Sequence, residues 1–321
     1  MNSPEHDRHE LTRWIKSKAE SLGFVACGVS RADLPAEDSS RLNSWLADGF
    51  QGDMGYMERN KEKRLDPRLL VPGARSVISF LISYYPEKEI PQKDNYKIAR
   101  YAYGKDYHFV IREKLHLITR ELADRVSNPR VGNPVLPASR VFTDSAPVLE
   151  RTWAVKASLG FIGKNTCLIN PKLGSFVFIA EIITGIELEY DTATVNDMCG
   201  GCTRCIDACP TGAITAPRRL DARRCISYHT IESRKELPPE QKDRFGDWIF
   251  GCDICQEVCP WNRKAIPHHE KQFLPANELL EMNKQKWEAL NREEFDTMFH
   301  ESAIQRTTYE GIKRNIIFLK K

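Results

Sequence analysis

Cysteine is the residue type whose spacing first indicates chemistry in this sequence. Of the ten cysteines, all but Cys27 and Cys167 lie between Cys199 and Cys259. They form two groups, Cys199-x2-Cys202-x2-Cys205-x3-Cys209-Pro210 and Cys252-x2-Cys255-x3-Cys259-Pro260, with Cys225 upstream of the second. Such short spacings wrap a tight loop around a metal cluster, and a CxxxC step followed by proline is typical of 4Fe–4S sites. CxxC pairs also bind zinc, so two zinc sites are the alternative.

The order of the cysteines also predicts which of them share a cluster. In a bacterial ferredoxin the fourth cysteine of each run binds the cluster of the other run. One predicted cluster therefore has the ligands Cys199, Cys202, Cys205 and Cys259. The other has the ligands Cys209, Cys225, Cys252 and Cys255. Because Cys225 is displaced, an insert over residues 226–251 precedes Cys252, and we expect this insert to have a function that a plain electron carrier does not need.

Length and composition set the frame for these sites. The chain has 321 residues, of which 41% are hydrophobic and 28% charged, which is typical of a globular protein of about two domains. A net charge of +3 does not by itself indicate a nucleic-acid-binding protein. Since no apolar run reaches the ~18 residues of a membrane span and the first residues lack a signal peptide or twin arginine, we expect a cytoplasmic protein that makes no membrane contact. Nothing in the sequence demands more than a monomer.

The elements that must position the cysteines are mixed in type. Apolar periodicity predicts helices over residues 9–22, 38–49 and 106–126, and one from Pro147 to about Ser158. Strands are predicted at 23–30, 76–85, 140–143 and 175–184, the last in the middle of a sheet because it is apolar on both faces. A Pro- and Asn-rich stretch breaks the chain at 127–139. The pattern lacks regular βαβ alternation, and no GxGxxG or P-loop sequence occurs.

Several segments together resemble one family. They include RYAYGKDYH (100–108), TDSAPVLERTWAVKASLGFIGKNT (143–166), CGGCTRCIDACPTGAI (199–214) and FGCDICQEVCPWN (250–262). In this order, over nearly the whole chain, they are similar to epoxyqueuosine reductases. This cobalamin-dependent family, related to reductive dehalogenases, reduces epoxyqueuosine to queuosine at the wobble position of certain tRNAs, the last step of queuosine biosynthesis.

The resemblance implies an α+β architecture with a division of labour. Residues 1–188 would form a nitroreductase-like, cobalamin-binding catalytic domain. Residues 189–263 would form a bacterial-type ferredoxin domain with two 4Fe–4S clusters, which receives electrons from an external donor. Residues 264–321 would form a helical C-terminal segment. Longer family members continue into a HEAT-like repeat that helps to hold tRNA, so extensive C-terminal tRNA contact is in doubt here.

Asp144 is the residue that the resemblance implies as the catalytic proton donor. It lies in the Thr-Asp-Ser-Ala-Pro motif, between a predicted strand end and a predicted helix start. A carboxylic acid that donates a proton at neutral pH needs a raised pKa, which we expect burial against the corrin to supply. The alternative is that Asp144 is an N-cap for the helix that opens at Pro147.

Other residues are candidates for the cofactor and the entrance of the site. The residues expected to contact cobalamin are Arg64, Asp144, Lys164, Asn165, Ser227, Arg234, Cys252 and Asp253. For the Gly-Lys-Asn loop the alternative is a plain turn, and for the insert it is a solvated connecting helix. Tyr103, Asp106, Tyr107 and His108 either line the substrate entrance or only cap and pack. No glycine follows Asp106-Tyr107-His108 at the spacing of a D-x-H-x-x-G motif, so we expect base-off cobalamin with no lower histidine ligand. Cys27 and Cys167 are interpreted as small core residues.

The expected macromolecular partner is the anticodon stem-loop of a tRNA that carries epoxyqueuosine. The basic candidates for binding it are Arg59, Lys61, Lys63, Arg64, Arg218, Arg219, Arg223, Arg224, Lys313 and Arg314, although charge runs are often only solvated faces. Trp261 and Tyr228 are candidates to stack on a splayed base. Two other functions stay open at this point, a cytoplasmic reductive dehalogenase and a non-enzymatic electron-transfer module.

Overall fold

An antiparallel sheet organises the first half of the chain. The computed structural model describes residues 4–126, 138–192 and 197–320. The sheet has the strand order β1 (Ala26–Arg31), β2 (Ser76–Ser83), β7 (Val177–Thr184) and β4 (Ser139–Phe142), and each neighbouring pair is antiparallel. The predicted strands are therefore confirmed, with β7 inside the sheet, and so is the mixed helix and sheet architecture. The predicted break at 127–139 lies mostly outside the described residues.

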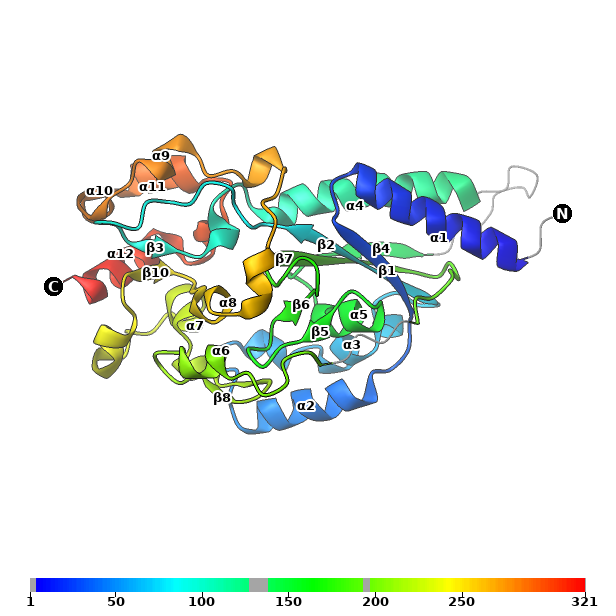
Figure 1. The fold of residues 1–321 in the computed structure, drawn as a ribbon, viewed down its shortest axis with the longest axis horizontal. Coiled ribbons are helices and arrows are strands. Elements are labelled where there is room, and N and C mark those ends of the chain that lie inside the picture. Colours follow the sequence, from blue (N-terminus) through cyan, green and yellow to red (C-terminus); the bar gives the residue numbers. More distant parts are fainter. Residues whose placement is uncertain (1–3, 127–137, 193–196, 321) are drawn as a thin grey trace.

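Helices cover the two faces of this sheet (Figure 1). On one face lie α1 (Pro4–Ser21) and α4 (Tyr107–Val126), whose apolar side chains join those of Val29, Ile78 and Ile182 in the main core. On the other face lies α5 (Glu150–Lys156), so close that a Cβ on Gly28 would stand 2.1 Å from the Ala157 carbonyl oxygen. The helices α2 (Ala36–Ala47) and α3 (Lys61–Leu65) lie beyond α5.

The start of α5 differs from the prediction. The helix begins at Glu150, three residues after Pro147, and its N-cap position is occupied by Leu149, which makes no side-chain capping bond. Residues 143–148 instead form tight turns, in which Ser145 N donates to Thr143 O at 2.6 Å and Val148 N donates to Ala146 O at 2.8 Å. Asp144 is therefore not the N-cap of this helix, and its carboxylate is free for other contacts.

Short elements lie between and beside the cysteines. These are β5 (Phe161–Ile162), β6 (Leu168–Ile169), α6 (Arg204–Asp207), β8 (Ile214–Ala216), β9 (Arg219–Leu220) and α8 (Ile254–Glu257). Two of them, α6 and α8, contain one cysteine each. The insert contains α7 (Ile226–Ile231) and β10 (Trp248–Phe250), and β10 pairs in parallel with β3 (Lys97–Ile98). The insert is thus packed against the first half of the chain, and the alternative of a solvated connecting helix is wrong because most of α7 is buried.

The C-terminal segment closes the fold over the insert (Figure 1). It contains α9 (Asn277–Leu280), α10 (Lys284–Ala289), α11 (Arg292–Phe299) and α12 (Thr308–Leu319). From α12, the buried Asn315 amide donates to Thr230 O and Ile249 O, at 2.9 and 2.8 Å. The main hydrophobic core runs through all three predicted segments, from Ile15 to Leu319. Within the described ranges, no helix has both the length and the apolar character that crossing a membrane requires.

Candidate active site

Asp144 stands on the loop between β4 and α5 in an unusual backbone conformation. Its φ is +53°, which is left-handed and uncommon for a residue other than glycine. Its backbone N–H donates to Glu150 Oε1, and its carboxylate Oδ2 accepts a hydrogen bond from Tyr107 Oη at 2.6 Å. The Asp144 side chain remains 63% exposed. Strained residues of this kind cluster at functional sites, and this one presents an accessible carboxylate.

The first turn of α4 faces Asp144. His108 Nε2 lies 3.6 Å from Asp144 Oδ2, and His108 Nδ1 lies 2.7 Å from Asp106 Oδ1. The Tyr107 ring is stacked between His108 and Phe178, with ring centroids 4.2 Å apart on each side. The structure thus brings together Asp106, Tyr107, His108 and Asp144, which favours the entrance interpretation of this segment over a purely capping one.

The electrostatics at Asp144 differ from the expectation of a raised pKa. Although the side chain is largely exposed, the surrounding loop removes part of the water around the carboxylate, which acts to raise its pKa. The nearby His108, the hydrogen bond from Tyr107 and the charge of Arg151 more than offset this effect, so the pKa is lowered. The pKa of His108 is raised to about 9, because Asp106 and Asp144 stabilise the imidazolium against the opposing effect of burial. Both shifts favour a charged His108 ring beside an ionised Asp144.

Two further acids lie beneath this loop, and sequence reasoning missed both. Burial and the neighbouring charge of Asp144 raise the pKa of Glu150 to about 8. Glu181 is fully buried on β7 with neither carboxyl oxygen hydrogen-bonded, and burial next to Glu150 raises its pKa well above the usual value. The signal for Glu181 was an acid in the otherwise apolar strand VFIAEIIT. Glu150 carried no signal, since an acid at the start of a helix is ordinary.

Cysteines that the predicted ligand sets group together are electrostatic neighbours in the structure. Burial and the neighbouring thiols of Cys199, Cys259 and Cys202 raise the pKa of Cys205 to about 11. Around Cys252 and Cys255 the neighbouring thiols are Cys225 and Cys209, which belong to the same predicted set, the second quartet. Cys167 is a further neighbour of Cys255. Over the described part of the chain, no three His, Cys, Asp or Glu side chains converge as the ligands of a single ion would.

Backbone N–H groups point at several of these sulfurs, as a cluster site requires. Ala213 N donates to Cys209 Sγ at 3.3 Å. The N–H groups of Ser227 and Tyr228 act to lower the pKa of Cys225, although burial outweighs them and the net shift is upward. Ser227, a predicted cobalamin contact, therefore has a backbone role at the second quartet. Cys167 lies beside Cys255, closer to the second quartet than its interpretation as a core residue implied.

The remaining predicted cobalamin contacts fall into two groups. Four of them form hydrogen bonds within the chain. Lys164 Nζ donates to Gly200 O, and Asn165 Nδ2 donates to Cys255 O. Arg234 donates to Ile231 O and Arg306 O, and Asp253 accepts from the backbone and the side chain of Arg100. Arg64 is different. It is only 8% exposed, its Nε has no hydrogen-bond partner, and it lies within electrostatic reach of Asp144 and Glu150. Arg64 thus keeps a buried donor free next to the acid loop.

The helix α5 links the acid loop to the second quartet. At its start, Glu150 holds the Asp144 backbone, and the next residue, Arg151, donates through Nη1 to Thr166 O at 2.6 Å. Thr166 lies between Asn165, which binds the Cys255 carbonyl, and Cys167, which lies beside the Cys255 thiol. A continuous series of contacts through α5 therefore joins the acid loop to the cluster region.

Comparison with known proteins decides the family. Residues 64–145 match the family described as "Epoxyqueuosine reductase QueG, DUF1730", and residues 198–262 match the "4Fe-4S double cluster binding domain". An epoxyqueuosine reductase of Cellulophaga algicola is 50% identical over 307 residues, which cover 95% of this chain and 97% of that protein. The chain belongs to the epoxyqueuosine reductase family.

Solved structures of epoxyqueuosine reductases share the fold. One in complex with an epoxyqueuosine-modified tRNA-Tyr stem-loop has a TM-score of 0.87 at 32% identity, covering 97% of this chain and 80% of that one. A Bacillus subtilis epoxyqueuosine reductase, in which the loop with the catalytic aspartate is swung out of the active site, has a TM-score of 0.85 at 32% identity, covering 97% and 81%. The epoxyqueuosine reductase of Pseudomonas aeruginosa is 40% identical, covering 97% of this chain and 85% of that protein.

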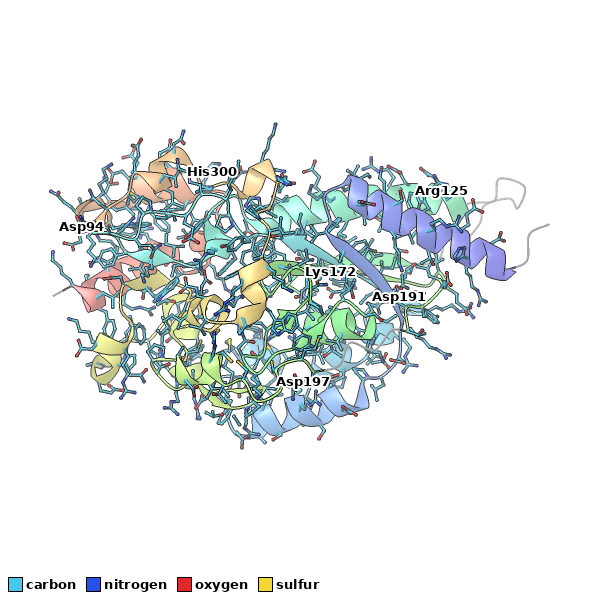
Figure 2. All side chains as sticks on the ribbon, viewed as in Figure 1. Asp94, Arg125, Lys172, Asp191, Asp197 and His300 are labelled. Carbon is cyan, nitrogen blue, oxygen red and sulfur yellow. The ribbon has the colours of Figure 1, made fainter. Side chains whose placement is uncertain are left out.

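For an epoxyqueuosine reductase, the basic and aromatic candidates for RNA contact are unevenly placed. Three of the basic candidates form ion pairs within the chain: Arg218 with Asp197, Arg219 with Asp48 and Arg223 with Asp221. Figure 2 shows that Asp197, the partner of Arg218, lies far from Arg125 at the end of α4. The Lys313 and Arg314 side chains bind backbone carbonyls of neighbouring elements. The prediction for Tyr228 is wrong, since this side chain is 7% exposed and its hydroxyl accepts from Asp53 N. Trp261 is half-buried and packs edge-on against Phe161.

Proposed function

We propose that this protein reduces the epoxide of epoxyqueuosine to queuosine at the wobble position of tRNA, the last step of queuosine biosynthesis. The observation that carries the proposal is the physical link between an accessible, strained aspartate and a double-cluster domain through one short helix, α5. Membership of the epoxyqueuosine reductase family and the stem-loop complex of a relative support the choice of substrate.

Within this proposal the chain has three working parts. Residues 1–188 form the catalytic domain, residues 189–263 the electron-transfer domain and residues 264–321 a helical segment that packs on the insert. The catalytic domain is assigned the nitroreductase-like class, and an external donor of single electrons reduces the clusters. The ligand sets are the two cysteine quartets, Cys199, Cys202, Cys205 and Cys259, and Cys209, Cys225, Cys252 and Cys255.

The residues near Asp144 suit a corrinoid, whose rim carries many amide groups. Arg64 offers a buried N–H without a partner, and it lies within electrostatic reach of the exposed Asp144 carboxylate. Ser227, Cys252 and Asp253 lie at or next to the second quartet. When bound, base-off cobalamin supplies a strongly reducing cobalt centre that receives electrons from the clusters. Asn165, Lys164 and Arg234 would hold the loops next to the corrinoid.

The chain's own residues then handle the proton. Tyr107 and a Glu150 carboxyl oxygen hold Asp144 by its side chain and its backbone, and the Asp144 carboxyl group remains exposed. Asp144 delivers a proton to the epoxide oxygen as its C–O bond breaks. A lowered pKa without substrate is compatible with this role, because a bound substrate removes water from the exposed carboxylate and so favours its protonated form.

The test uses the full chain, reconstituted without oxygen with iron, sulfide and cobalamin. The substrate is a tRNA anticodon stem-loop that carries epoxyqueuosine, with a chemical reductant, and mass spectrometry follows the loss of one oxygen atom from the base. We expect conversion to queuosine and an EPR signal of base-off cob(II)alamin beside those of the reduced clusters. Loaded protein that leaves the epoxide intact but dehalogenates a haloarene would overturn the proposal, and so would protein that takes up clusters but no corrinoid.

A further inference from the structure

The chemistry of epoxide removal needs more protons than one carboxyl group holds. When an epoxide becomes an alkene, both C–O bonds break, a C=C bond forms, and the oxygen leaves as water. The balance requires two electrons, here from the external one-electron donor through the clusters, and two protons. Asp144 carries one proton at a time, so it must be protonated again within each turnover. This inference rests on the proposed function.

A second proton-holding group lies in line with Asp144. Asp106 Oδ1, the His108 ring and Asp144 Oδ2 form a continuous series, with 2.7 Å from the carboxylate to Nδ1 and 3.6 Å from Nε2 to Asp144. The backbone of α4 fixes the first half, since His108 N also donates to Asp106 Oδ1 at 2.9 Å. The stacked Tyr107 ring fixes the plane of the imidazole.

We propose that His108 passes a proton to Asp144 in each turnover, with Asp106 orienting its ring. A carboxylate on one imidazole nitrogen sets the tautomer and leaves the other nitrogen to exchange a proton with its partner. His108 does not touch the substrate in this proposal. It acts through Asp144, to which it returns a proton. The His108 side chain is 24% exposed, so water can restore its proton from outside.

The charges around His108 keep a proton on its ring, which makes it a proton store beside Asp144. The two acids Asp106 and Asp144 flank it, Glu150, Arg151 and Glu181 lie behind Asp144, and Tyr107 is in stacking contact. The balance raises the pKa of His108 to about 9, so that the ring is charged at neutral pH. Tyr107 has a pKa well above its usual value, because it is buried beside Asp144, and therefore stays a neutral donor. When Asp144 gives up its proton, the nearest charged acid is His108.

The first test compares the full-chain, reconstituted His108→Gln variant with wild type on the epoxyqueuosine stem-loop. We expect kcat near pH 7 to fall by about 10- to 100-fold with KM unchanged, and the alkaline fall in kcat to disappear with the histidine. In Asp106→Asn the fall in kcat at high pH should begin at a lower pH than in wild type. The matched control is His116→Gln, an exposed histidine on the same helix, which should leave kcat and its pH profile unchanged.

The second test does not depend on turnover. Nitrogen NMR of histidine side chains in the full chain with oxidised clusters, assigned by His108→Gln, should show one ring that titrates near pH 9. The pKa of this ring should fall in Asp106→Asn and in Asp144→Asn. A His108 that titrates near 6.5, or a His108→Gln variant with wild-type kcat and pH profile, would overturn the inference. If wild type makes no queuosine, the proposed function fails while the titration still reports on His108.

Discussion

The cluster region and the acid loop differ in how they are built. The cluster cysteines lie within 61 residues of one another, from Cys199 to Cys259, and their loops make short local turns. The acid loop instead draws on distant parts of the chain, with Tyr107 and His108 from α4, Glu150 from α5 and Glu181 from β7. The ligand set follows from local spacing, whereas the proton site exists only after the sheet and its helices have packed. Mutations should therefore affect the two regions separately.

The largest expected effect separates proton delivery from cluster binding. In Asp144→Asn the amide keeps the size of the side chain but cannot donate an acidic proton, so kcat should fall by about 10²- to 10⁴-fold. Iron content and the visible spectrum should stay at wild-type values. The control is Asp124→Asn, an exposed acid farther along α4. Wild-type turnover in Asp144→Asn would show that another group is the proton donor.

The next effect tests the displaced ligand. In Cys225→Ser the second quartet loses a thiolate, so the iron content should drop from about eight to about four per chain while the first cluster remains. Electron supply to bound cobalamin would be lost with it. Cys167→Ser removes a thiol beside the same quartet and should retain both clusters. Equal iron loss in both variants would mean that Cys167 is a ligand and the assignment of the second set is wrong.

A smaller effect concerns the acid beneath the loop. Glu181 is fully buried and its carboxyl oxygens have no partner, so the folded protein bears the cost of desolvating it. In Glu181→Leu we expect the free energy of unfolding to rise by about 1–3 kcal/mol, seen as a higher apparent unfolding temperature. The exposed Glu20→Leu should change little. Destabilisation by Glu181→Leu would mean that the acid is satisfied by a group such as bound water and contributes to the fold.

The smallest effect is a pH dependence of stability. The folded protein raises the pKa of His108 from 6.5 to about 9, so its stabilising contribution is fully present below about 6.5 and is lost as the pH rises through 9. His108→Gln should therefore lower the apparent unfolding temperature at pH 6 more than at pH 9.5, by a small amount because the group is partly exposed. A difference that does not change with pH would mean that His108 contributes by packing alone.

What the sequence determined by itself was the set of local patterns. The cysteine spacing predicted the two quartets, because ligands held by tight loops must be close in the chain. Apolar runs predicted the strands of the sheet, including β7 in its middle because it is apolar on both faces, and helical periodicity predicted most helices. The Asp144 motif was visible too, but the start of α5 was misplaced, since turns at 143–148 use the residues that the pattern assigned to a helix.

Only the tertiary structure decided how these patterns act together. Packing of α4 against β7 and the acid loop set His108 and Tyr107 beside Asp144 and lowered its pKa, opposite to the expectation from burial alone. The same packing buried Tyr228 and paired several of the basic residues. A pKa depends on the net balance of burial, hydrogen bonds and neighbouring charges, and those neighbours lie far away in sequence. The spacing of residues along a chain cannot supply that balance.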